Sequence, residues 1–315
     1  MALKKTILVL GATGYIGRRL IQRLRVNNPE HQIFGLSMPG EPNAEAEGWR
    51  SLEGDVMQPH LARLLEELQP DEIYHAIGID RYAPLKNQLL LYAEGTRHLL
   101  QSLVDVQSPA RVVIVGSAAE YGPHDGPVDE SAACRPNTEY GVSKLAQTQV
   151  AILFARQYKL PVMIGRVFNV YGQTPQNFVV ASLAAQVARL ELGKLSYPKL
   201  KLKNTESVRD LIHIDDAADA LIAIADRGCP GEIYNIGSGR GIAISALLQR
   251  MLDQSPVSNV EVQLQGEQIP DFSEADVTKM IRQTGWQPQI DLETGLAGEL
   301  TYWRDEVAFQ ALHSR

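Results

Sequence analysis

The chain has 315 residues, of which 44% are hydrophobic and 21% charged, and its formal net charge is −7. This composition is typical of a globular protein with a large core, and the length suits one domain of ordinary size with a smaller one attached. The acidic balance argues against a nucleic-acid surface, which needs clustered Lys and Arg, but it permits a small anionic ligand held by a few local cations.

The two cysteines and the N-terminal residues exclude two further classes of protein. Cys134 and Cys229 lie far apart and lack metal-ligand spacing, so we expect neither a metal site nor a disulfide framework. The apolar run after Lys4 and Lys5 is too short for a signal peptide, and no run is long enough to span a membrane. We therefore expect a cytoplasmic protein without a membrane partner.

Short β-branched runs alternate with longer helical patterns through the first half of the chain. Strands are predicted at residues 6–10, 32–36, 72–76, 111–116 and 161–167, and helices at 16–27, 61–68, 85–105 and 137–158. Continuous apolar runs such as Val112–Val115 indicate strands buried on both faces, as in a parallel sheet. The alternation predicts a doubly wound α/β fold.

The pattern changes after Val170. A helical segment at 179–192 leads into a basic stretch at 197–204, a strand is predicted at 232–237, and the remainder mixes helices with turn-rich pieces. We expect a first domain at 1–170, to which residues 209–238 return, and a smaller, interleaved C-terminal substrate domain at 171–315.

A glycine-rich turn follows the first strand directly and opens a helix. Glycines in this place permit a tight turn and close approach to a pyrophosphate, while the helix start offers N–H donors. The context favours a Rossmann-type dinucleotide site over a purely structural turn. The residues predicted to bind the cofactor here are Gly11, Thr13, Gly14, Tyr15, Ile16 and Gly17.

The second strand ends at Ser37 and Met38, without the acidic residue that usually binds the ribose 2′-hydroxyl in NAD-selective folds. This absence favours NADP, with NAD as the alternative. No arginine follows the strand; Arg18 and Arg19 are either contacts to a 2′-phosphate or solvated helix residues.

Two further strand ends supply candidate cofactor contacts. Asp55 and Val56 are expected to border the adenine, although Asp55 is equally typical of a plain turn. His75 and Ala76 end the strand at 72–76, on the edge where parallel sheets bind ligands.

Ser117, Tyr140 and Lys144 form the candidate catalytic group. Ser117 ends the strand at 111–116, and Tyr140 and Lys144 are four residues apart near the start of the helix at 137–158, so they share one helix face. We expect the lysine to lower the tyrosine pKa, Tyr140 to exchange a proton with an alcohol or ketone, and Ser117 to hydrogen-bond the same oxygen.

Motifs along nearly the whole chain resemble the extended short-chain dehydrogenases/reductases of the NAD-dependent epimerase/dehydratase family, which act on nucleotide sugars. They are GATGYIG, PDEIYHA, GSAAEYG, PVDES, YGVSK, RVFNVYG, SVRDLIHIDD, YNIGSG and TGWQP. The resemblance implies that Asn169 contacts the sugar nucleotide and that Arg209 binds its diphosphate; the alternative for Arg209 is a local ion pair. It also implies a homodimer formed by the helices at 85–105 and 137–158.

Within the family, dehydratases carry an Asp-Glu pair where this chain has Ala118 and Ala119, which disfavours dehydration. The segments from Phe168 to 193 and at 207–216 are most similar to NADPH-dependent reductases of GDP-4-keto-6-deoxy-mannose. An epimerase acting at C4 with tightly bound NAD is the first alternative, and a non-catalytic NAD(P)-binding sensor or scaffold is the second.

Three departures from the family pattern suggest a different nucleotide sugar. After His75 the chain reads AIGIDRYAPLKNQLL where the family has small residues. It has LYAEGT where many relatives place an Asn before the Gly-Thr pair, and Gln265 where a diphosphate-binding arginine is expected.

Overall fold

A seven-stranded parallel sheet forms the centre of the larger part of the molecule. The computed structural model describes residues 4–38, 48–58, 60–194, 199–202, 204–258, 260–265 and 271–313. The strand order is β10-β6-β5-β4-β1-β2-β3, and every neighbouring pair is parallel. The strands are β1 (Thr6–Leu10), β2 (Gln32–Ser37), β3 (Arg50–Glu53), β4 (Glu72–His75), β5 (Arg111–Ser117), β6 (Val162–Val167) and β10 (Ile233–Ile236). The strand order reverses at β1, which confirms the doubly wound fold predicted from the sequence.

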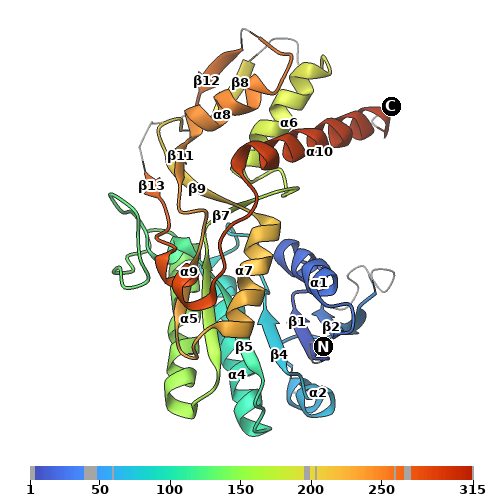
Figure 1. Ribbon diagram of the computed structural model, residues 1–315, viewed down its shortest axis with the longest axis vertical. Coiled ribbons are helices and arrows are strands. Elements are labelled where there is room, and N and C mark those ends of the chain that lie inside the picture. Colours follow the sequence, from blue (N-terminus) through green and yellow to red (C-terminus); the bar gives the residue numbers. More distant parts are fainter. Residues whose placement is uncertain are drawn as a thin grey trace.

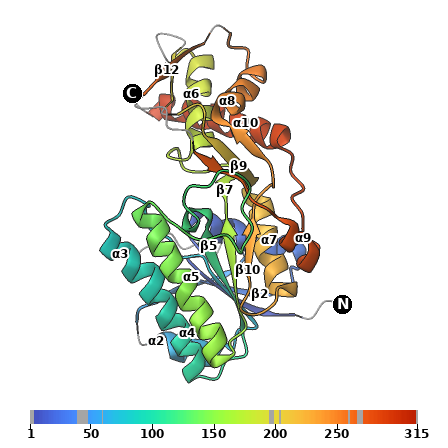
Figure 2. The same ribbon diagram turned by 90° about the vertical axis from the view of Figure 1, so that its left-hand side faces the viewer.

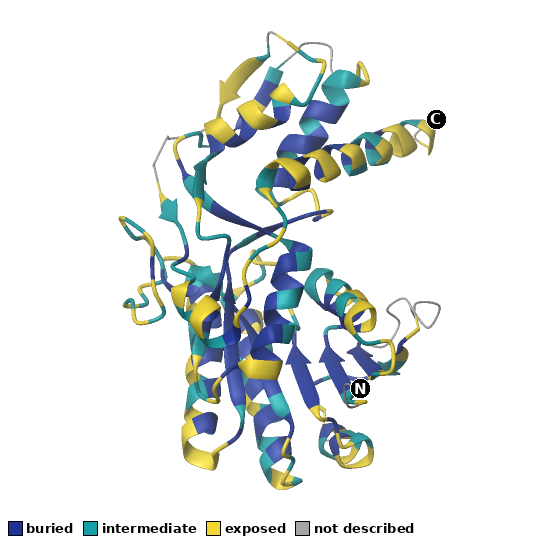
Figure 3. Cartoon of the chain, viewed as in Figure 1, coloured by how far each residue is buried: buried dark blue, intermediate teal, exposed yellow. Residues whose placement is uncertain are grey.

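Helices cover both faces of this sheet, which is why its strands are almost entirely buried (Figure 3). On one face lie α1 (Tyr15–Asn27), α7 (Ile214–Arg227) and α9 (Thr278–Thr284), whose apolar side chains share a core with the strands (Figure 1). On the other face lie α2 (His60–Leu68), α4 (Gly95–Asp105) and α5 (Glu139–Tyr158) (Figure 2).

The helix predicted at residues 85–105 is divided into three parts. It consists of α3 (Leu85–Leu89), a π-helical turn η2 (Leu90–Glu94) and α4. A π turn takes up an extra residue within a helix and often marks a functional position. Thr138 is the N-cap of α5, and its hydroxyl accepts a hydrogen bond from the N–H of Gly141 at 3.0 Å.

The smaller part of the molecule is built mainly from the second half of the chain. A sheet of β11-β9-β13 with β7 beside β9 and a two-stranded sheet of β8 and β12 lie with helices that share one apolar core. These elements are β7 (Asn169–Tyr171), α6 (Val179–Glu191), β8 (Lys199–Leu202), β9 (Val208–His213), β11 (Gly241–Ala243), α8 (Ile244–Asp253), β12 (Glu261–Leu264), β13 (Phe272–Ser273) and α10 (Leu292–His313). Within the described ranges, every helix is too short or too polar to cross a membrane.

The chain passes between the two parts more than once. Of residues 209–238, which the sequence assigned to the first domain, α7 and β10 lie with the large sheet, whereas β9 pairs with β7, β11 and β13. We propose that residues 1–170 together with α7 and β10 form the cofactor-binding domain.

Candidate active site

The glycine turn between β1 and α1 has the geometry of an anion-binding helix start. Gly11 has a φ of +78°, and a Cβ there would lie 2.8 Å from the Ala76 carbonyl oxygen. A Cβ on Gly17 would lie 2.1 Å from the Gly11 carbonyl oxygen, so helix and turn pack without room for a side chain. Gly14 is the N-cap of α1, with no side-chain cap and no acidic residue in the first turn. The N–H donors of this helix start therefore suit a pyrophosphate.

His75 lies at the carboxyl end of β4 with no hydrogen-bond partner. Its side chain is fully buried, and neither ring nitrogen has a partner within the described part of the chain. Burial, assisted by the charge of Lys144, lowers the pKa of His75 to about 3, so the imidazole stays neutral. The next residue, Ala76, continues the ladder by donating its N–H to Leu10. An orphaned buried imidazole on this edge fits a polar ligand.

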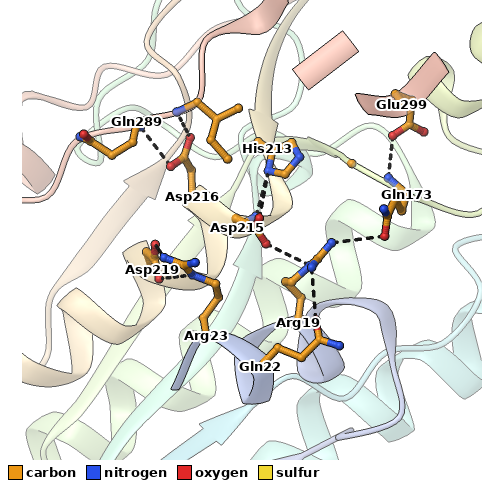
Figure 4. Close-up of polar contacts among 12 residues, drawn as sticks. Arg19, Gln22, Arg23, Gln173, His213, Asp215, Asp216, Asp219, Gln289 and Glu299 are labelled. Carbon is orange, nitrogen blue, oxygen red and sulfur yellow. Dashed lines mark hydrogen bonds and ion pairs between the residues drawn. The ribbon is translucent and has the colours of Figure 1, made fainter. Parts of the chain in front are cut away.

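Residues of the first turns of α1 reach toward the smaller part of the molecule (Figure 4). Tyr15 donates its hydroxyl to the Gly172 carbonyl at 2.8 Å, and Ile16 packs against the core. Arg19 forms an ion pair with Asp215 at 3.0 Å. The suggestion that Arg19 reaches a 2′-phosphate is therefore not supported, whereas Arg18 is exposed.

The ends of β2 and β3 lie side by side. Ser37 is buried and its carbonyl accepts a hydrogen bond from the Gly54 N–H at 2.9 Å. Asp55 accepts one from the Met57 N–H at 2.9 Å, which is the arrangement of a turn aspartate, and Val56 is buried. Thr13 in the glycine turn is partly exposed.

The structure brings Ser117 and Tyr140 together. Ser117 is the last residue of β5 and the N-cap of a short 3-10 helix, η3 (Ala118–Glu120). Desolvation raises the pKa of the Tyr140 phenol, and a hydrogen bond with the Ser117 side chain opposes that rise. The expectation that the Tyr140 pKa lies below its ordinary value is wrong, because burial of the phenol raises this pKa. Tyr140 therefore remains a proton donor across the neutral range.

Lys144 lies one turn further along α5, with its ammonium buried. The ammonium donates to the Val115 carbonyl and to the Gln147 side chain, each at 2.9 Å, and Gln147 in turn donates to Thr96 at 3.0 Å. Burial lowers the pKa of Lys144 to about 8, and the charge of Glu120 opposes the shift. The lysine is thus protonated at neutral pH but close to titration.

A buried ion pair behind Ser117 was missed by the sequence reasoning. Glu120 accepts a hydrogen bond from the Ser117 N–H at 2.9 Å and pairs with Arg166 at 2.8 Å, and both charged side chains are almost fully buried. Arg166 also lies over the Tyr121 ring at 4.5 Å. The GSAAEYG and RVFNVYG motifs contain both partners, but they are 46 residues apart, so only the fold shows their contact.

The two substrate candidates are near one another on neighbouring strands. Asn169 on β7 donates its side-chain amide to the Asp210 carbonyl at 3.1 Å. Arg209 on β9 forms a two-point ion pair with Asp271, at 2.8 and 2.6 Å. A diphosphate at Arg209 would have to compete with that carboxylate.

A family model described as the NAD dependent epimerase/dehydratase family matches residues 7–237. The chain belongs to this family. Across 91% of its length it is 28% identical to 92% of a dTDP-6-deoxy-L-talose 4-dehydrogenase (NAD(P)(+)) from Kitasatospora kifunensis. Across 80% it is 27% identical to 86% of a GDP-6-deoxy-D-mannose reductase from Pseudomonas aeruginosa.

A solved dTDP-glucose 4,6-dehydratase from Streptomyces venezuelae superposes with a TM-score of 0.82 and 26% identity, covering 96% of this chain and 98% of that one. The comparisons confirm the family, the Rossmann-type fold and an NAD(P)-dependent enzyme of nucleotide-sugar chemistry. The names of these three relatives specify different reactions and different nucleotide sugars.

Proposed function

We propose that the protein reduces the C4 ketone of a 4-keto-6-deoxy nucleotide sugar, such as GDP-4-keto-6-deoxy-mannose, with NADPH. The observation that carries this proposal is the pairing of Ser117 with Tyr140 beside a buried Lys144, while alanines occupy positions 118 and 119. Alanine transfers no proton, so the site is equipped to protonate one oxygen but lacks the extra acid and base that elimination of water requires.

The protein's own groups complete the reduction at the carbonyl oxygen. When bound, NADPH supplies the hydride that adds to C4. Tyr140 gives its phenolic proton to the oxygen as negative charge develops there, and the Ser117 hydroxyl hydrogen-bonds the same oxygen. The carbonyl thereby gains a hydride at carbon and a proton at oxygen and becomes a secondary alcohol. Glu120 supports Ser117 through the backbone N–H.

The binding residues follow the same assignment. The glycine turn and the first turn of α1 take the pyrophosphate of the cofactor, and His75 and Ala76 border it. Asn169 and Arg209 take the sugar nucleotide, with Asp271 giving up its contact to Arg209. We further propose a homodimer formed through the helix at residues 85–105, which comprises α3, η2 and α4, together with α5.

A panel of GDP-, UDP-, dTDP- and CDP-linked 4-keto sugars with NADPH, followed at the nicotinamide absorbance, tests the function. We expect NADPH oxidation with one of these sugars and none with a 4-hydroxy sugar. Copurifying NAD and interconversion of 4-hydroxy sugars without NADPH consumption would instead establish an epimerase. Bound cofactor with no turnover of any sugar would favour a non-catalytic sensor or scaffold.

A further inference from the structure

Tyr92 is a buried aromatic residue in the π-helical turn η2, outside the group assigned above. Its side chain is 1% exposed. It belongs to the LYAEGT segment, where the sequence departs from the family pattern. A π turn is an uncommon way to continue a helix, and it re-aims the side chains that it contains.

The ring of Tyr92 contacts both members of the proposed catalytic pair. The Lys144 ammonium lies over the ring face, 4.1 Å from its centroid. The Tyr140 ring meets the Tyr92 ring edge-on, with centroids 6.0 Å apart and planes at 77°. Among the described residues, Tyr92 is the aromatic residue whose ring contacts both Tyr140 and Lys144.

The Tyr92 ring supplements the two hydrogen-bond acceptors of the Lys144 ammonium. An ammonium has three N–H donors, and the carbonyl of Val115 and the side chain of Gln147 accept from it. Within the described residues no carboxylate forms an ion pair with Lys144, so its charge is buried with only neutral acceptors. The negative face of an aromatic ring offsets part of this cost.

The hydroxyl of Tyr92 has a second task. It accepts a hydrogen bond from the Ile79 N–H at 3.0 Å and lies 3.2 Å from the Ile79 carbonyl, to which it donates. Ile79 belongs to the loop at residues 77–84, which also carries Arg81. The Arg81 guanidinium lies 5.6 Å from the centre of the Phe178 ring, at the start of α6. The loop therefore connects the catalytic side of the site to the smaller part of the molecule.

We infer that Tyr92 is a positioning residue, whose ring face holds the Lys144 ammonium in the site and whose hydroxyl fixes the loop at residues 77–84 beside it. This inference rests on the proposed function, in which Tyr140 and Lys144 form the catalytic group.

Two substitutions at position 92 test the roles of the Tyr92 ring and of its hydroxyl separately. Tyr92→Phe removes the hydroxyl and keeps the ring, so the alkaline limb of the rate profile should stay in place while KM for the sugar nucleotide rises several-fold. Pentafluorophenylalanine at position 92 keeps the shape of phenylalanine but removes the negative ring face. Relative to Tyr92→Phe, it should lower the pKa of Lys144, and with it the alkaline limb, by about one pH unit.

The titratable groups around Lys144 must stay the same in this comparison. Glu120 on η3 and His75 on β4 interact electrostatically with Lys144, and neither of them is changed. Tyr74 is the matched control, since it is a fully buried tyrosine whose hydroxyl bonds Glu72. The same two substitutions at position 74 should lower the melting temperature without moving the limb.

A readout without turnover separates failure of this inference from failure of the proposed function. The Lys144 side-chain resonance, assigned with Lys144→Arg, is titrated by NMR in the Phe and pentafluorophenylalanine proteins. Equal pKa values for Lys144 in the two would overturn the positioning role of the ring. Unchanged turnover in Tyr140→Phe would overturn the proposed function, while the NMR titration would still report on the contact between Tyr92 and Lys144.

Discussion

At the level of single residues, Tyr140 and Lys144 have different protonation behaviour: the phenol stays protonated, whereas the ammonium is close to titration. Desolvation keeps the Tyr140 phenol protonated, with Ser117 beside it. Lys144 has its pKa lowered to about 8 by burial, so it carries its charge only below that pH. The raised pKa of Tyr140 suits a group that donates a proton to an alkoxide. The lowered pKa of Lys144 means that the site loses a stabilising positive charge as the pH rises.

Replacing Tyr140 by phenylalanine tests this division of roles. The ring and its edge contact with Tyr92 remain, so the melting temperature should change little, while turnover should fall by about 10²- to 10⁴-fold, as for a lost general acid. In the unmodified enzyme, turnover should decline as the pH rises through about 8, because Lys144 then loses its proton. Steady-state rates of the two proteins across pH measure the loss of turnover and its decline at alkaline pH. Full activity in Tyr140→Phe would show that the tyrosine is not the proton donor.

At the level of elements, we propose that the end of β2 determines the preference between NADPH and NADH. Ser37 is buried there and Met38 is half-exposed, so neither presents a carboxylate to a 2′-phosphate. The residues at 39–47 that follow lie outside the described part of the chain. On α1, Arg19 forms an ion pair with Asp215, and Arg18 is exposed. We propose Arg18 as the residue that contacts a 2′-phosphate.

We expect NADPH to bind about tenfold or more tightly than NADH, which corresponds to one charge-assisted hydrogen bond of roughly 1.5 kcal/mol. Calorimetric titration of both cofactors measures the ratio. Arg18→Ala should reduce the preference, whereas Arg19→Ala, its neighbour on the same helix, should leave it unchanged. A preference for NADH in the unmodified protein would contradict the interpretation of this strand end.

At the scale of the whole molecule, one helical face has apolar side chains exposed to solvent. Leu90 on η2 and Leu153 on α5 are 51% and 54% exposed, and the helices that carry them lie side by side on the outside of the large sheet (Figure 2). Contiguous apolar patches, rather than single exposed side chains, mark interfaces, and we propose that Leu90 and Leu153 belong to such a patch. They are the residues through which the proposed homodimer would pack.

A charge placed on this face should separate the two copies. Leu153→Asp is expected to give a monomer in light scattering coupled to size exclusion, because dimerisation would bury the carboxylate. Leu312→Asp on α10 is the matched control, since Leu312 is 75% exposed but belongs to another element. A monomeric unmodified protein, or a Leu153→Asp dimer, would contradict the assignment of this face.

Local sequence patterns determined much of the fold and the composition of the site. Strand and helix periodicity placed β1, β5 and α5 within a residue or two, because each element is specified by neighbouring residues. The glycines before α1 and the four-residue spacing of Tyr140 and Lys144 are likewise local features. The match to the family confirms the conclusions about fold and enzyme class that were drawn from them.

The interaction partners of these residues follow from the way the chain folds, not from local sequence patterns. Arg209 pairs with Asp271, which is 62 residues away, and Glu120 pairs with Arg166, which is 46 residues away. Lys144 meets a ring from the π turn rather than the phenol of its own helix. Charge pairing, desolvation and ring contacts depend on which distant segments the fold brings together, and sequence periodicity contains no information about those distances.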